Sequence, residues 1–305
     1  MIFLPAFLSL ILTLALVPSV HACVTKVTEI EEPSGTRLTA SHFPSRRARN
    51  PLDDYANALV NHDSTSEEQN EEQACISPID PNVMVAVWKD YSTGTRRVGH
   101  AYSHDGGLTW HDELFPQMYY DCQSDPSLAV DAQGIFTADI ITFPCSANRS
   151  GIIQVSSYDG GVTWQDSVWA VHDLAVQNLE DKQMLAVDAV SGSPYQGTFY
   201  CTWRRFYNYP SGDSIRINLV LKRPGQPYSE PRVLSHNVNA NWSNVCVGVN
   251  GKVYVSWLDY DDQMDHWVIK MSHSLDGGDT WSPDNFVVTP AFEAATIEPI
   301  LLVFG

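Results

Sequence analysis

Positive charge is scarce in this sequence. Its 305 residues hold 18 Lys and Arg against 36 Asp and Glu, so the formal net charge is −18. A nucleic-acid partner needs a basic face that neutralises phosphates, and the acidity argues strongly against that class of function. Low-complexity sequence is also lacking, and with 44% hydrophobic residues the chain can bury a large core. We interpret the excess acidity as the solvated exterior of a soluble protein.

The N-terminal segment lacks Lys and Arg and is almost wholly apolar from Ile2 to Val20. A small residue, Ala22, ends this segment as signal peptidase requires, so residues 1–22 are predicted to be a cleaved signal peptide. A membrane anchor and a lipid-modified Cys23 are the alternatives. We therefore expect a secreted, extracellular protein that has no membrane attachment after the signal is removed.

Residues 23–69 differ in composition from the rest of the chain. Residues 64–70 are polar and acidic, and residues 46–49 form a basic cluster. We interpret the segment as an irregular acidic leader, whose basic cluster is either a processing site or a solvated loop.

Three stretches share the form S-x-D-G-G-x-T-W, at residues 103–110, 157–164 and 274–281. Asp-Gly-Gly allows the positive φ angles of a tight hairpin turn, and Asp, Ser and Thr can bond the nearby backbone. Trp supplies a large apolar surface to bury. The repeated positions therefore have structural roles, and they are Asp105, Trp110, Asp159, Trp164, Asp276 and Trp281.

The repeat period predicts a further copy. The Asp positions are 54 and then 117 residues apart, so a degenerate copy is expected about halfway along the longer gap. Residues 221–231 fit, with Gly225 in the glycine position and Tyr228 in place of Trp. Short β-branched and aromatic runs precede each copy and are typical of strands. Four strands per repeat indicate an all-β fold, a β-propeller, with an array of β-sandwiches as the alternative.

The chain ends in another strand-like run. Residues 298–304 match residues 125–131 position by position, which predicts about four blades plus the first strand of a fifth. An open propeller would expose sheet edges. We therefore expect the propeller of residues 70–305 to be incomplete at its C-terminus, unless residues 23–69 supply outer strands.

Six cysteines fit a secreted protein. Cys122 precedes the first strand of the second repeat, and Cys145 ends its second strand. Antiparallel strands place these two positions at the same end of the blade, which predicts a Cys122–Cys145 disulfide. Cys75, Cys201 and Cys246 lie in strand runs and are expected to be buried.

These motifs resemble the Asp-box, or BNR, repeats of the sialidase (neuraminidase) superfamily, most closely its secreted non-viral members, over about residues 70–305. The resemblance implies a six-bladed propeller whose boxes join the third and fourth strands on the face away from the ligand. It implies release of terminal sialic acid by a Tyr nucleophile, a Glu that activates it, an Asp acid/base and three Arg that hold the sugar carboxylate. We expect a monomer that binds a glycan or glycoconjugate and has no cofactor and no metal.

The sequence departs from the family pattern on its opening strand. The family carries an Arg-Ile-Pro motif there, whereas residues 75–78 read Cys-Ile-Ser-Pro and hold no Arg. The nucleophilic Tyr belongs to a late blade, beyond Gly305. The resemblance leaves Asp90 as the acid/base candidate, because the family places an acidic residue after the second strand of the first blade.

Topology indicates where a site would lie. The starts of first strands and the ends of second strands share one end of each blade, near the axis, and polar and aromatic groups that converge there suit a sugar pocket. Two alternatives stay open: these groups satisfy the backbone at strand ends, or they hold a cation. The substrate-binding candidates are Glu71, Asp125, Asp181, Arg204, Arg205, Asn244, Asp259 and Glu298.

The sequence thus predicts a secreted sialidase-like propeller that recognises glycans, as an exo-glycosidase that releases terminal sialic acid. A non-catalytic propeller that binds protein or polysaccharide is the alternative, and an incomplete, non-functional fragment is a third interpretation.

Overall fold

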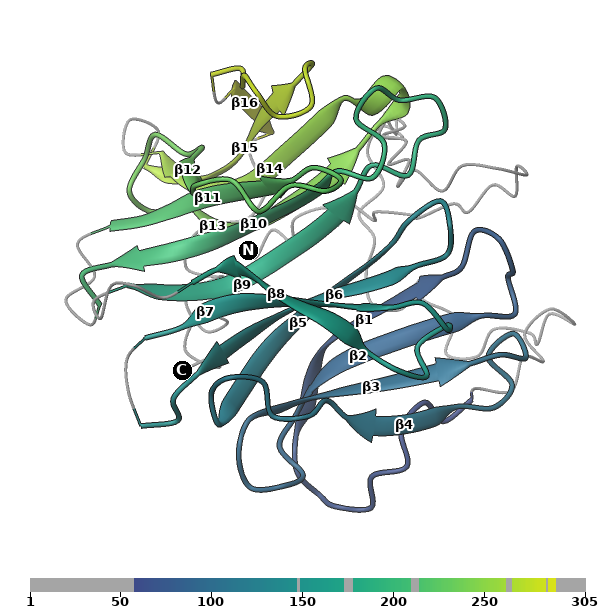
Figure 1. Ribbon diagram of the computed structural model, residues 1–305. Helices are drawn as coiled ribbons and strands as arrows, with labels where there is room; N and C mark the ends of the chain where they lie inside the picture. Colours follow the sequence, from purple (N-terminus) through teal and green to yellow (C-terminus); the bar gives the residue numbers. More distant parts are fainter. Residues whose placement is uncertain are drawn as a thin grey trace, which may run out of the picture.

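The computed structural model describes residues 58–146, 149–172, 178–209, 214–261, 265–283 and 285–288. These residues form four separate antiparallel sheets of four strands each, which follow one another along the chain and lie face to face (Figure 1). Apart from one short turn of 3-10 helix, η3 (Val249–Gly251), the described part of the chain contains only strands and loops. The predicted all-β architecture is confirmed.

Each sheet runs in chain order from its first to its fourth strand. Sheet 1 contains β1 (Gln69–Ile76), β2 (Met84–Asp90), β3 (Arg97–Ser103) and β4 (His111–Leu114). Sheet 2 contains β5 (Cys122–Val130), β6 (Phe136–Phe143), β7 (Gly151–Ser157) and β8 (Gln165–Val171). Sheet 3 contains β9 (Leu179–Val187), β10 (Phe199–Tyr207), β11 (Ser214–Lys222) and β12 (Arg232–Val233). Sheet 4 contains β13 (Asn241–Val247), β14 (Val253–Asp261), β15 (His266–Ser274) and β16 (Asn285–Val288).

The first strands of successive sheets lie beside one another, β1 beside β5, β5 beside β9 and β9 beside β13. Three apolar clusters fill the spaces between neighbouring sheets. Sheet 2 packs on both faces, so β6 is buried along its whole length. This burial includes the polar side chains of Thr137, Asp139 and Thr142 as well as the apolar ones, as expected for a strand between two packed layers. The first strands therefore converge on the middle of the assembly.

The Asp boxes join third and fourth strands, as predicted. In the first box, Asp105 Oδ1 accepts the backbone N–H of Thr109 at 2.9 Å, and Oδ2 accepts the Thr109 hydroxyl at 2.6 Å. Trp110 Nε1 donates to the Gly107 carbonyl at 3.1 Å, which closes the turn. Hydrogen bonds from Thr109 and then Ser103 lower the pKa of Asp105 to about 2. The conserved geometry of the turn explains why the same residue types recur.

The degenerate copy lies where the period predicts it, between β11 and β12. Ser229 donates its N–H to the Leu221 carbonyl at 2.8 Å and accepts the Leu221 N–H on Oγ at 3.1 Å. In the third clear box, Ser282 makes the same pair of bonds with His273, at 2.8 and 3.0 Å. Tyr228 therefore stands in the position that Trp occupies in the intact boxes, directly before this serine.

Asp159→Ala in the second box is expected to lower the free energy of unfolding by about 1 kcal/mol, because solvent screens this exposed carboxylate. Burial would raise the pKa of Asp159, but hydrogen bonds from Thr163 and Ser157 bring it below its usual value. The stabilisation is present above the unfolded pKa of about 4 and is lost as the pH falls through the lower folded pKa. Urea unfolding should show a smaller difference from wild type near pH 3 than near pH 7; equal differences would contradict the assignment.

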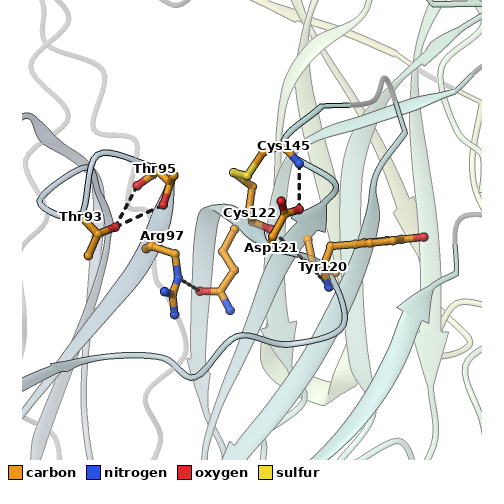
Figure 2. Close-up of a disulfide and its surroundings, with 9 residues drawn as sticks. Thr93, Thr95, Arg97, Tyr120, Asp121, Cys122 and Cys145 are labelled. Atoms are coloured by element: carbon orange, nitrogen blue, oxygen red, sulfur yellow. Dashed lines mark hydrogen bonds between the residues drawn. A yellow bond between two sulfur atoms is a disulfide. The ribbon is translucent and has the colours of Figure 1, made fainter.

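The predicted disulfide is present. Cys122 opens β5, and its bond to Cys145 closes a separation of 23 residues. Asp121 accepts the backbone N–H of Cys145 at 2.9 Å, so two adjacent residues anchor the same loop (Figure 2). Cys201 is fully buried, whereas Cys75 is only partly so.

The predicted signal peptide of residues 1–22 and the strand at residues 298–304 lie outside the described residues. Of the predicted leader, residues 58–69 are described, and His62 Nδ1 lies 2.5 Å from Asp112 Oδ1 on β4. The described helical structure includes no helix long and apolar enough to cross a membrane.

Candidate functional site

Each first strand is interrupted by a bulge near its start, where the register with the second strand shifts. One residue of each bulge has a positive φ, and these residues are Glu71 (62°), Asp125 (45°), Lys182 (54°) and Trp242 (46°). Positive φ is uncommon for residues other than glycine, and bulges redirect side chains next to functional sites. All four bulges lie at the end of the sheets opposite the Asp boxes, because first-strand starts pair with second-strand ends.

The bulge corrects one predicted position. Trp242, and not Asn244, is the residue of sheet 4 that corresponds to Glu71, and Asn244 lies two residues further along β13 with an exposed side chain. The error has a physical reason: side chains alternate along a strand with a period of two. A shift of two residues therefore leaves the apolar pattern of the strand unchanged, so the sequence alignment could not detect it.

Charged side chains from the first three sheets interact at this end of the fold. Lys182 of β9 pairs with Glu71 of β1, and Lys89 Nζ of β2 lies 3.4 Å from Asp125 Oδ1 of β5. We call this group the inner-strand cluster, and it comprises Glu71, Lys89, Asp125, Asp181, Lys182 and Arg204. Its ion pairs connect β9 with β1 and β2 with β5, so the cluster spans the place where the first strands converge.

Arg204 connects the cluster to sheet 4. Its guanidinium pairs with Asp181, which lies directly opposite on β9, and donates to Asn241 Oδ1 of β13 at 2.8 Å. Its side chain also lies over the Phe206 ring, 5.1 Å from the centroid. Arg204 is therefore fixed in position by three contacts, with its guanidinium at the site.

Two groups of the cluster, Asp181 and Lys182, have pKa values that are shifted towards neutrality. Burial raises the pKa of Asp181, Arg204 opposes this, and the charge and hydrogen bond of the neighbouring Asp125 raise it further. Burial, and then the charge of Arg204, lower the pKa of Lys182 to about 8. A carboxyl whose pKa is raised by burial and by a second carboxylate is better suited to donate a proton to a reacting oxygen. Lys182 and Arg204 can in turn bind an anionic group.

The second-strand ends hold a different arrangement. Trp88 Nε1 donates to Asp90 at 2.9 Å, Trp257 Nε1 donates to Asp259 at 3.1 Å, and Trp203 Nε1 donates to Glu180. Sheets 1, 3 and 4 therefore share one buried contact, an indole with a carboxylate. The Trp-x-Asp spacing at residues 88–90 and 257–259 was visible in the sequence, but its structural meaning was not.

Asp90 lies in that contact and is only 3% exposed. Its carboxylate also accepts hydrogen bonds from Gln69 and Ser92. It borders a polar cavity of about 260 Å³, whose lining includes His62 and Asp112 and none of the inner-strand cluster. The structure therefore places the predicted acid/base candidate apart from the cluster.

The remaining predicted site residues divide in the same way. Asp259 is fully buried and lies 3.5 Å from Lys270 Nζ. Arg205 pairs with Glu180, which is 4% exposed, and so serves sheet 3 internally. Glu298 lies outside the described residues. Across the described ranges, no group of three or more His, Cys, Asp or Glu side chains is placed to hold a metal ion.

Comparison with known proteins agrees with this architecture. The BNR/Asp-box repeat family model matches residues 101–112, which include the whole of the first box. No curated protein matches the sequence. Many chains of known structure share the fold, among them a protein of unknown function from Dyadobacter fermentans, with 13% identity and a TM-score of 0.53 over 72% of this chain and 68% of that one.

Two similar structures carry named activities. One is an α-L-arabinofuranosidase of Fusarium graminearum in complex with an iminosugar inhibitor, with 12% identity and a TM-score of 0.51 over 72% of this chain and 66% of that one. The other is the NanB sialidase from Streptococcus pneumoniae, with 10% identity and a TM-score of 0.52 over 82% of this chain and 56% of that one. Identities this low establish the fold alone. The chain carries a BNR/Asp-box repeat, and its four antiparallel sheets share the fold of these structures.

Proposed function

We propose that this chain recognises a glycan at the inner-strand cluster. The observation that carries the proposal is the convergence of six charged side chains at the end of the sheets opposite the Asp boxes. The bulge residues with positive φ lie at this same end of the sheets. A few convergent polar groups are typical of small-ligand sites. Similar folds carry an arabinofuranosidase and a sialidase, which makes a sugar the ligand class with the most support.

The finer form of the proposal is an exo-glycosidase that releases terminal sialic acid. Asp181, whose pKa is raised by burial and by the neighbouring Asp125 against the opposing effect of Arg204, would donate a proton to the glycosidic oxygen. Arg204 and Lys182 would bind the sugar carboxylate. Asp90 is less suitable for the acid/base role, because Trp88 and Ser92 occupy its carboxylate.

A non-catalytic binding propeller is the second candidate. It is favoured by the internal ion pairs of the cluster, since each carboxylate and each cation there has a partner of opposite charge. Such a site would exchange these pairs for contacts with a ligand and would need no chemical step. For both candidates we also propose a six-bladed propeller whose fifth blade begins at residue 298. Both candidates are proposed to be secreted and monomeric.

Arg204→Ala is expected to weaken glycan binding at least about 10-fold, because it removes a fixed guanidinium from the site. The measurement is calorimetric titration of the full chain with 3′-sialyllactose. Arg205→Ala is the matched control: it is the adjacent arginine on β10, but its partner is Glu180. We expect Arg205→Ala to lower Tm and to leave the dissociation constant within about 2-fold of wild type. An unchanged constant in Arg204→Ala would move the site elsewhere.

The same preparation separates an enzyme from a binder. If the chain is a sialidase, wild type hydrolyses a fluorogenic sialoside, and Asp181→Asn loses turnover while it keeps affinity for 3′-sialyllactose. Binding without turnover in wild type would favour the non-catalytic candidate. Wild type that neither binds nor turns over these sialosides would overturn the sialic-acid form of the proposal.

A further inference from the structure

A group of aromatic side chains, of which Tyr119 and His172 are exposed and Tyr120 and Trp169 half-buried, lies on sheet 2 outside the inner-strand cluster. The Tyr119 ring stands edge-on to Trp169 at 4.7 Å and to Tyr120 at 4.9 Å between centroids. His172 lies 4.7 Å from Trp169 and 6.0 Å from Tyr119. We call these four residues the aromatic platform. Arg149 adds a cation over the Tyr120 ring at 5.3 Å.

The backbone conformation that exposes Tyr119 is strained. Tyr119 has φ of 63°, and the N–H of Tyr120 donates to the Met118 carbonyl at 2.7 Å. This is a γ-turn with a positive φ at its centre, which is a rare and strained conformation. The turn leaves Tyr119 64% exposed, although a large aromatic side chain favours burial. Strain that exposes an aromatic ring suggests a function for that ring.

The platform is firmly anchored. Thr142 Oγ1 of β6 donates to the Met118 carbonyl at 2.8 Å and lies 3.3 Å from the Tyr120 nitrogen. The Cys122–Cys145 disulfide follows Tyr120 by two residues, and Tyr120 extends away from it (Figure 2). The strained turn is therefore braced by β6 and by a covalent bond.

The platform also lies at the functional end of the fold. Tyr120 leads into the start of β5, and Trp169 lies at the end of β8. In an antiparallel sheet these positions share one end, and Asp125 on β5 lies at that end too. The second Asp box joins β7 to β8 at the opposite end. The platform and the Asp125 part of the inner-strand cluster thus lie at the same end of sheet 2.

We propose that the aromatic platform is a second glycan subsite that stacks pyranose rings of an extended oligosaccharide whose end is held at the inner-strand cluster. The proposal rests on the proposed function and adds that the ligand is a chain of several sugars. Pyranose rings present apolar C–H faces that pack on aromatic rings, and exposed aromatic patches mark binding surfaces. Arg149, over the Tyr120 ring, and His172, beside Trp169, add polar groups to the platform.

The test is affinity electrophoresis of the full chain in native gels that contain mucin, galactan or ulvan. We expect wild type to be retarded in at least one gel, and Tyr119→Asn to weaken that binding at least about 5-fold, because asparagine tolerates the positive φ but offers no ring. Tyr158→Asn is the matched control: Tyr158 is 53% exposed but lies beside the second Asp box. Quenching of Trp169 fluorescence by the retarding polysaccharide is the second readout, absent in Trp169→Phe.

The outcomes separate this proposal from the proposed function. If Tyr119→Asn binds the polysaccharide as wild type does while Arg204→Ala does not, the platform proposal is wrong and glycan recognition at the cluster stands. If Tyr119→Asn loses the polymer but retains 3′-sialyllactose, the platform is supported as a separate subsite. If wild type is retarded in none of the gels, the platform proposal is overturned, whereas the titration with 3′-sialyllactose still decides on the cluster.

Discussion

Asp139→Asn is expected to raise the free energy of unfolding by about 2 to 4 kcal/mol near pH 8 and to leave it nearly unchanged near pH 4. Asp139 on β6 is fully buried between sheets 2 and 3, and burial raises its pKa from 3.8 to about 7. Hydrogen bonds from Cys201 and Gln154 and the charge of Lys222 oppose the shift only in part. An amide has the shape of the protonated carboxyl and no charge.

The surroundings of Asp139 explain why its ionised form is costly. Gln154 donates to Oδ1 at 3.2 Å, whereas Oδ2 has no hydrogen-bond partner in the described structure. Gln154 Oε1 lies 3.3 Å from Lys222 Nζ, so the nearest cation acts through an intervening amide. Burial also raises the pKa of Cys201 and of Tyr228, so neither is a charged partner. A buried charge without a direct partner destabilises a fold.

The sign of the pH dependence follows from the raised pKa. Between about pH 4 and pH 7 the folded chain holds a proton on Asp139 that the unfolded chain has released, so stability falls as the pH rises. The variant lacks this loss, so its stability advantage over wild type grows through that range and is complete above it.

Urea unfolding of the disulfide-bonded protein at several pH values measures how the free energy of unfolding depends on pH in wild type and in Asp139→Asn. Asp259→Asn is the contrasting control, because Asp259 is equally buried but faces Lys270 at 3.5 Å, and the change should destabilise the fold. An Asp139→Asn variant that is less stable than wild type near pH 8, or that keeps the wild-type pH slope, would refute the assignment.

The Asp boxes show how far local sequence determines this structure. Ser, Asp, Gly and Thr in the box bond to one another within a few residues, as the contacts of Asp105 show. A pattern of this kind is complete in the sequence, and even the degenerate copy at Tyr228 was predicted from its spacing. The disulfide between Cys122 and Cys145 follows from topology for the same reason, since one hairpin brings both residues together.

The candidate site is less accessible to sequence reasoning because it depends on register and on contacts between sheets. Asp125, Asp181 and Arg204 were predicted from their places at strand ends. Their pairing, and the assignment of Arg205 to Glu180, depends on which way each side chain of β10 points. The platform residue Tyr119 had no signal at all, since its exposure results from a γ-turn and not from composition.

Gly161→Ala in the second Asp box is expected to lower the free energy of unfolding by about 3 kcal/mol, from overpacking and from an unfavourable backbone conformation. Gly161 has φ of 95°, and a Cβ atom there would lie 2.6 Å from Val85 Cγ2 and 2.9 Å from Tyr102 Cβ. Both contacts belong to sheet 1. Val85 is fully buried, and the Tyr102 Cβ moves only with its backbone, so neither neighbour can move aside without a large energetic cost.

The contacts of Gly161 with sheet 1 show that an Asp box can pack on a neighbouring sheet in addition to reversing the chain. The turn of sheet 2 packs on sheet 1 through Gly161. In the same way, a Cβ atom added at Gly278 of sheet 4 would lie 2.6 Å from Leu221 Cδ2 of sheet 3. In the second and third clear boxes, the second glycine is therefore required by the neighbouring sheet as well as by the turn. A change there should weaken the interface between sheets and the turn together.

Gly225→Ala in the degenerate box separates these two effects. Gly225 has φ of 70°, but a Cβ atom there would meet nothing within 4 Å. This variant should therefore cost only the left-handed backbone term of about 1 kcal/mol. Urea unfolding of both variants gives the comparison. If Gly161→Ala costs no more than Gly225→Ala, the second box is only a turn, and its packing on sheet 1 contributes nothing measurable to stability.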